Sequence, residues 1–297
     1  MPSRPLVIAH RGASGYRPEH TLAAYELAIE MGADFIEPDL VITRDGVLVA
    51  RHENDITGTT DVIDRPEFRS RRKTKWIDGR EVTGWFTEDF TLAEIKTLRA
   101  RERLEFRDRQ FNGMFEVPTF QEILELARRR NVGVYPETKF PSYLRSIGLP
   151  LEEPMVEALQ AAGFQGRDAA VFLQSFERVS LKLLKTMTDL PRIQLLDDAA
   201  HTMATPEGLA EIATYADGIG PDKRLIVPAG PDGRLRPPTS LVEDAHRAGL
   251  LVHPWTFRSD PVFLAPDYEG DAVREIEQFL SLEVDGLFTD FPDLIAR

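Results

Sequence analysis

The sequence predicts one (β/α)₈ barrel domain over residues 1–297, because short apolar runs alternate with amphipathic stretches along the chain. The expected strands are 5–9, 34–42, 132–138, 169–176, 192–196, 216–220, 250–255 and 285–289. Such alternation is typical of βα units closed into a parallel barrel. A doubly wound open sheet is the alternative, but no Gly-x-Gly-x-x-Gly turn follows the first strand.

The expected helices lie between these strands and carry end signals. They cover 22–31, 120–130, 154–162, 178–188, 206–215, 241–248 and 272–280. Capping boxes, in which a hydroxyl and a Glu side chain bond each other's backbone amides, are expected at Thr91/Glu94, Thr119/Glu122 and Ser240/Glu243. Gly32, Gly163 and Gly249 fit helix C-caps.

One stretch does not fit the simple alternation. The hairpin sequence RDGVLVARHEND, with a Gly turn, follows the second strand, and residues from about 55 to 117 then separate it from the next helix. This length exceeds an ordinary βα loop. We expect an inserted segment over the barrel mouth, with one helix that starts at Thr91.

Composition limits the classes of partner. A net charge of −13 argues against nucleic acid, whose phosphates require a basic face, but allows a small phosphate ligand at a local positive site. The absence of Cys excludes thiol catalysis, thiolate metal sites and disulfides. No apolar run is long enough for stable membrane insertion, and none resembles a signal peptide. We therefore expect a cytoplasmic protein as given, or an exported one if a signal was removed. A homodimer is compatible with the sequence.

Carboxylates stand where predicted strands end. Glu37 and Asp39 are two residues apart and point the same way, and Glu137 ends the following strand. A lone carboxylate pair would more often be matched by arginines inside the barrel. Three converging carboxylates favour a hard divalent cation, Ca²⁺ or Mg²⁺. Pro38 between the first two predicts a bulge or a strand end.

Histidines and cations follow the same strands. His10 and His52 would flank the carboxylates together with Arg11, Arg51 and Lys139. One such histidine is usually structural, but two of them beside a metal and fixed cations suit phosphoryl chemistry. The remaining histidines are expected to be structural or on the surface: His20, His201, His246 and His253.

Five motifs together resemble the glycerophosphodiester phosphodiesterases. They are HRGASGYRPEHT, EPDLVITRDGVLVARHEN, YPETK, LQSF and DGLFTDFP, in that order between residues 7 and 292. The resemblance is closest to the bacterial type with an insertion after the second strand. It implies a TIM barrel that hydrolyses a small glycerophosphodiester to sn-glycerol 3-phosphate and an alcohol.

The resemblance also implies roles for individual residues. His10 and His52 would be the catalytic residues. One Ca²⁺ or Mg²⁺ ion would be bound by Glu37, Asp39 and Glu137. Arg11 and Lys139 would contact phosphate, Phe176 and Trp255 would form an aromatic wall, and Glu19 would orient its neighbours.

Two other functions remain open from the sequence. A related barrel phospholipase that acts on lysophospholipids would need an apolar rim, for which Trp76, Trp85 and Phe86 are candidates. A non-catalytic phosphoester-binding barrel would be expected to lack a histidine or a metal ligand, and none is missing here.

Overall fold

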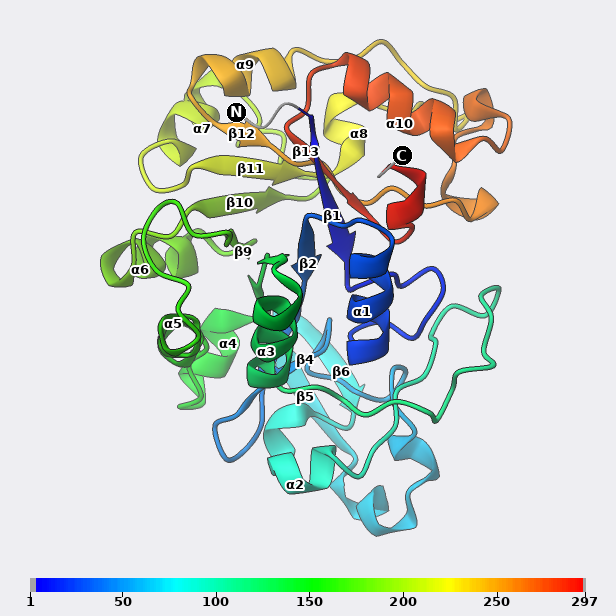
Figure 1. Cartoon of the computed structure of the whole chain (residues 1–297), viewed down its shortest axis with the longest axis vertical. Coiled ribbons are helices and arrows are strands. Elements are labelled where there is room, and N and C mark those ends of the chain that lie inside the picture. The colour runs from blue at the N-terminus through cyan, green and yellow to red at the C-terminus, as the bar shows by residue number, and fades with distance from the viewer. Residues whose placement is uncertain (1–3, 296–297) are drawn as a thin grey trace.

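The computed structural model describes residues 4–295, and their parallel strands close into the predicted barrel (Figure 1). The barrel strands are β1 (Leu6–His10), β2 (Phe35–Glu37), β3 (Asp39–Ile42), β7 (Gly133–Val134), β8 (Glu137–Thr138), β9 (Leu173–Ser175), β10 (Arg192–Leu196), β11 (Gly218–Pro221), β12 (Leu251–Val252) and β13 (Gly286–Thr289). Strand β13 pairs with β1, and a bridge between Phe257 and Thr289 joins the chain after β12 to β13. The expected fold class is confirmed.

Prolines interrupt two strands of the barrel wall. Pro38 separates β2 from β3, and Pro136 separates β7 from β8, because a proline has no N–H to give to the ladder. Their carbonyl groups still accept, from Glu137 N at 2.9 Å and from Gln174 N at 3.0 Å. The strand end expected at Pro38 is therefore confirmed, and the barrel wall stays continuous across it.

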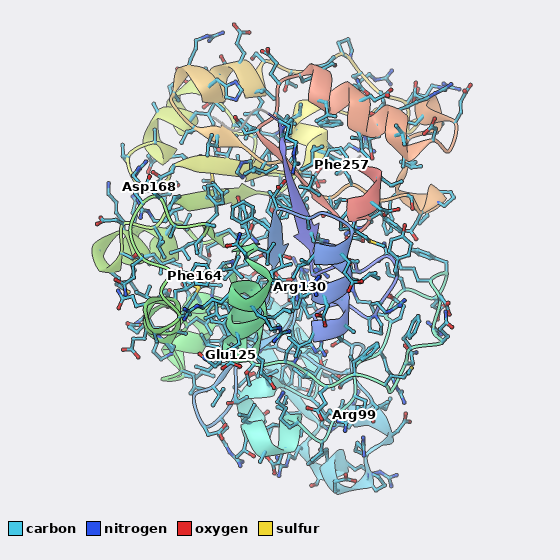
Figure 2. The ribbon with its side chains drawn as sticks, viewed as in Figure 1. Arg99, Glu125, Arg130, Phe164, Asp168 and Phe257 are labelled. Atoms are coloured by element: carbon cyan, nitrogen blue, oxygen red, sulfur yellow. The ribbon has the colours of Figure 1, made fainter. Side chains whose placement is uncertain are left out.

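The helices cover the outside of the barrel close to their expected ranges. They are α1 (Leu22–Glu30), α3 (Phe120–Arg130), α5 (Glu152–Ala161), α6 (Arg178–Met187), α7 (Pro206–Ile212), α9 (Leu241–Arg247) and α10 (Ala272–Ser281). Two short helices, α4 (Pro141–Ser146) and α8 (Lys223–Ile226), were not expected. Arg130, labelled in Figure 2, joins α3 to α1 through a bond of 2.8 Å to Glu26. Within the described residues, none of the helices is long and apolar enough to cross a membrane.

Two of the three expected capping boxes are present. Thr91 begins α2 (Leu92–Ile95) and Thr119 begins α3 with the reciprocal bonds in place. The prediction of a capping box at Ser240 is wrong, since the Ser240 hydroxyl donates to the Asp244 side chain at 2.6 Å instead of capping α9. The three expected C-cap glycines all have positive φ.

The chain between β4 (Leu48–Ala50) and α3 forms a substructure of its own beside the barrel (Figure 1). It contains η1 (Val62–Asp64), η2 (Pro66–Arg71), the hairpin β5 (Lys73–Ile77) and β6 (Arg80–Gly84), η3 (Thr87–Asp89) and α2. A separate hydrophobic cluster that includes Phe68, Phe90 and Leu98 supports it. Trp76 is 69% exposed, but Trp85 and Phe86 are buried, so two of the three candidates for an apolar rim are not available to form one.

The cap of α3 gives a stability prediction. Thr119→Ala removes the acceptor for Glu122 N, so the free energy of unfolding should fall by about 1 kcal/mol in urea titrations. Ser240→Ala is the matched control, because that hydroxyl makes no cap bond. Equal effects of the two substitutions would contradict this account of the helix ends.

Candidate active site

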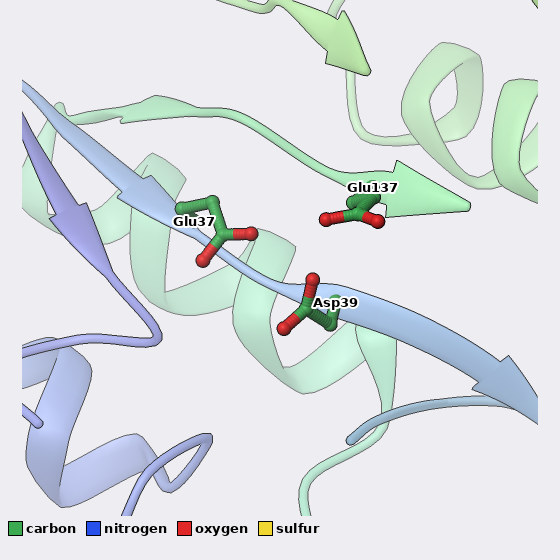
Figure 3. A group of neighbouring side chains, drawn as sticks. All are labelled: Glu37, Asp39 and Glu137. Carbon is green, nitrogen blue, oxygen red and sulfur yellow. The ribbon is translucent and has the colours of Figure 1, made fainter. Parts of the chain in front are cut away.

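The register in which neighbouring strands pair brings the site residues together at the carboxyl ends of the strands. His10 pairs with Glu37, Asp39 pairs with Glu137, and Glu137 pairs with Gln174. Neighbouring strands of a sheet lie about 4.8 Å apart, so these pairings place side chains within reach of one another. Figure 3 shows the carboxylates of Glu37 and Asp39 facing that of Glu137.

The three carboxylates form a compact acidic cluster. One oxygen from each of Glu37, Asp39 and Glu137 lies within 4.8 Å of the others, and all three residues are buried. Burial, with repulsion from Asp39 and Glu137, raises the pKa of Glu37 well above its usual range. Burial also raises the pKa of Glu137 to about 8, reinforced by Asp39. The three groups would therefore need additional positive charge to be ionised together, and their oxygen-only donor set fits a hard divalent cation.

Two cations touch the cluster. Arg11 lies 3.2 Å from Asp39 through Nε, and its backbone N–H donates to Glu37 at 2.8 Å. Lys139 donates to Glu137 at 2.8 Å and lies 3.7 Å from Asp39. Burial alone would raise the pKa of Asp39, but Lys139, His20 and Arg11 together hold that pKa well below its usual value. Asp39 is thus the member of the cluster that stays ionised most readily.

Gln174 was not predicted as a site residue, although it lies in the LQSF motif. Its Nε2 donates to Glu37 at 3.0 Å and to the Tyr135 carbonyl at 3.4 Å. Both of those neighbours are acceptors, which fixes the orientation of the amide. The signal in the sequence was a polar residue at a buried strand end, the same signal that identified Glu137.

His10 has a carboxylate partner that the sequence analysis also missed. Its Nδ1 lies 2.6 Å from Asp290 Oδ1, and Asp290 directly follows β13 in the DGLFTDFP motif. Burial and Arg11 lower the pKa of His10 to about 3, while Asp290 opposes them. The imidazole is neutral, and because a carboxylate can only accept, Nδ1 carries the proton and Nε2 keeps its lone pair.

His52 is more open to solvent than His10. Its side chain is 31% exposed, and its Nδ1 lies 3.3 Å from the exposed carboxylate of Glu53. Burial, Arg11 and Lys139 lower its pKa to about 4, so this imidazole is also neutral. The structure places it on the same cavity as His10, as the sequence predicts.

The loop after β1 holds Glu19 and His20 beneath the site. Glu19 accepts from Arg11 at 3.1 Å and from Arg103 at 2.9 Å. His20 is fully buried, and its Nε2 lies 2.8 Å from Asp39 while Nδ1 lies 2.7 Å from the Tyr25 hydroxyl. His20 therefore orients a member of the acidic cluster, a more specific structural role than the sequence indicated.

The tight turn at Gly12 allows this loop to pass close to α1. Its φ is +86°, and an added Cβ would lie 2.6 Å from the backbone carbon of Ala24. Arg51, expected beside the carboxylates, is instead fully buried below the loop, where it donates to the carbonyls of Glu19 and His20 at 2.9 and 3.4 Å. It does not line the cavity, so its expected position is wrong.

A cavity of about 530 Å³ opens over these groups. Its lining includes His10, Arg11, Glu37, His52, Glu137, Lys139, Gln174, Phe176, Trp255 and Arg258. The Phe176 and Trp255 rings meet edge to face, with their centroids 5.9 Å apart.

The other histidines lie away from this cavity. His253 is buried in the barrel interior, where its Nδ1 lies 2.8 Å from the Tyr135 hydroxyl. His201 and His246 are exposed, as expected.

Comparisons with known proteins identify a family for the chain. The model of the glycerophosphoryl diester phosphodiesterase family matches residues 10–294. Glycerophosphodiester phosphodiesterase GDPD6 of Arabidopsis thaliana is 42% identical, over 97% of this chain and 84% of that protein. The glycerophosphodiester phosphodiesterase of Bacillus subtilis is 33% identical, over 100% of this chain and 87% of that protein.

Solved structures share the fold. The glycerophosphodiester phosphodiesterase of Agrobacterium tumefaciens matches with a TM-score of 0.66 at 25% identity, over 98% of this chain and 99% of that one. An Oleispira antarctica phosphodiesterase, solved with the product sn-glycerol-3-phosphate, matches with a TM-score of 0.67 at 22% identity, over 98% and 95% of the two chains. From the family match and the identity to its relatives, the chain belongs to the glycerophosphoryl diester phosphodiesterase family.

Proposed function

We propose that this protein is a metal-dependent phosphodiesterase that hydrolyses glycerophosphodiesters to sn-glycerol 3-phosphate and an alcohol. The observation that carries the proposal is one cavity that brings together a buried acidic cluster, two histidines and two cations. Relatives that are 32–42% identical over nearly the whole chain bear the name of this activity. The substrate is a small molecule, and the negative charge of the chain disfavours nucleic acid.

The metal would be Ca²⁺ or Mg²⁺, held by Glu37, Asp39 and Glu137. When bound, it would act as a Lewis acid and neutralise charge on the phosphoryl oxygens. Arg11 and Lys139 bind the same phosphate and hold it beneath the two imidazoles.

The histidines divide the proton transfers. His10, whose tautomer is fixed by Asp290, presents the Nε2 lone pair and takes the proton of the nucleophile, either water or the 2-hydroxyl of the substrate glycerol. As the new P–O bond forms, the P–O bond to the alcohol breaks. His52 acts as the acid after it has taken up a proton from solvent, and the resulting imidazolium gives that proton to the leaving oxygen. If the 2-hydroxyl attacks, water opens the cyclic phosphate in a second step.

The remaining residues bind and orient. Phe176 and Trp255 form an apolar wall for the carbon face of glycerol, and Trp255 is held by a bond of 2.7 Å from Nε1 to the Gly220 carbonyl. Glu19 keeps Arg11 in place. We further propose that residues 1–297 act as one domain with an insertion at about 55–117; a homodimer stays a prediction.

A hydrolysis assay tests the function. The purified protein should release sn-glycerol 3-phosphate from a panel of glycerophosphodiesters when Ca²⁺ or Mg²⁺ is present, and excess EDTA should abolish the release. A lysophospholipid in the same panel tests the alternative substrate. Full activity in EDTA, or cleavage of the lysophospholipid alone, would overturn the proposal.

Metal binding can be measured without activity. Saturating Ca²⁺ or Mg²⁺ should raise the free energy of unfolding, by roughly 2.7 kcal/mol at a hundred times Kd, because the folded state alone presents the cluster. Asp39→Asn should remove most of this increment. Asp78→Asn, which alters a carboxylate on the cavity outside the cluster, should keep it. Equal increments in all three proteins would place the metal elsewhere.

The histidine roles predict a pattern across substrates. His10→Ala and His52→Ala should each lower kcat by about 10²–10⁴ on an alkyl diester. A nitrophenyl ester has a leaving oxygen that needs little protonation, so it should restore the rate of His52→Ala and not of His10→Ala. Rescue of the opposite variant would exchange the two roles, and equal losses on both substrates would mean that the histidines do not divide the proton transfers.

A further inference from the structure

Arg107 joins the substructure between β4 and α3 to the barrel mouth. Its Nη2 donates to Asp290 Oδ2 and to Asp260 Oδ2, both at 2.6 Å, and its Nε donates to Asp260 Oδ1 at 3.2 Å. Its Nη1 donates to the Ser14 carbonyl at 3.1 Å. The side chain is 6% exposed, although residues 108–110 beside it are exposed. All three guanidinium nitrogens are therefore engaged on the barrel.

Two of these bonds lead to His10. Arg107 and Arg258 both donate to Oδ2 of Asp290, at 2.6 and 2.8 Å, which leaves Oδ1 for the imidazole Nδ1 of His10. At the other end, the Ser14 residue whose carbonyl accepts from Arg107 donates through its hydroxyl to the His10 carbonyl at 2.8 Å. Arg107 thus contacts the partners of both the side chain and the backbone of His10.

We propose that Arg107 is a positioning residue for the hydrolysis, through which the substructure between β4 and α3 sets the orientation of the His10 imidazole. Arg258 donates to the same carboxylate from the barrel side, whereas Arg107 also connects that carboxylate to Asp260 and to the Ser14 loop. The effect on activity rests on the proposed function, whereas the His10–Asp290 geometry can be observed without it.

The planar guanidinium is essential to this role. Its donors lie in a fixed fork and reach three residues on different segments of the chain, while a lysine ammonium is one compact point charge. A shift of the imidazole by about 1 Å can cost as much as 10²-fold in rate. Arg107→Lys should therefore behave like Arg107→Ala, despite its charge.

Kinetics provide the first test. Arg107→Ala should lower kcat by roughly 10–10² while KM changes by less than about threefold, because no contact to substrate is removed. A few millimolar guanidinium ion should restore part of kcat in Arg107→Ala and have no such effect on Arg107→Lys, whose ammonium fills the space. Arg109→Ala is the matched control, since Arg109 is an exposed arginine two residues away.

Proton NMR provides a second test that does not depend on activity. A neutral imidazole bonded to a carboxylate should give a far-downfield Nδ1–H signal, assigned by its loss in His10→Ala. The signal should shift or broaden in Arg107→Ala and stay in place in Arg109→Ala. Asp260→Asn keeps Arg107 but weakens its bonds to residue 260, so it should shift the signal in the same direction by a smaller amount. This variant replaces Arg107→Ala in the test if Arg107→Ala does not fold.

The outcomes separate the two proposals. If Arg107→Ala folds, turns over at the wild-type rate and keeps the signal in place, the inference is overturned. A rise in KM with kcat unchanged would also overturn it, because Arg107 would then act in binding. If wild-type protein cleaves no glycerophosphodiester, the proposed function fails, and the NMR comparison still decides whether Arg107 positions His10.

Discussion

The repulsion among three buried carboxylates is the constraint on which the site depends. Glu37, Asp39 and Glu137 lie too close together, and too far from water, to be ionised at once without positive charge. The fold supplies part of that charge through Arg11 and Lys139, and it supplies neutral donors through Gln174 and the Arg11 backbone. The elevated pKa of Glu37 and of Glu137 shows that these compensations are incomplete. A further cation bound to the three carboxylates would supply the missing charge.

Candidate site residues at the ends of predicted strands could be identified from the sequence, because the direction of a side chain follows from its position along the strand. Glu37, Asp39 and Glu137 were predicted in this way, and so were His10 and Lys139. Asp290 obeys the same rule at the end of the last strand, and only the absence of a nearby chemical partner in the sequence hid its role.

Contacts between distant segments could not be predicted in this way. Arg107 and Asp290 are 183 positions apart, and nothing in the arginine-rich stretch around Arg107 marks one arginine as buried. The position of Arg51 was wrong for a related reason, because its side chain donates to carbonyl groups of the distant Glu19 and His20, which local sequence does not reveal. Trp85 is buried in the separate hydrophobic cluster that supports the chain between β4 and α3, and local sequence reveals neither that cluster nor the burial of Phe86.

The charge of the site explains how an acidic chain can bind an anionic diester. Arg11 is paired with Glu19 and Asp39, and Lys139 is paired with Glu137, so neither cation is free to attract phosphate. A divalent ion on the acidic cluster would change this balance, because the carboxylates would then share their charge with the metal. Binding of the metal would therefore also make Arg11 and Lys139 available to the phosphoryl oxygens. Metal and phosphate affinity would then be coupled through the same carboxylates, so that the local field, rather than the net charge of −13, would decide what the cavity binds.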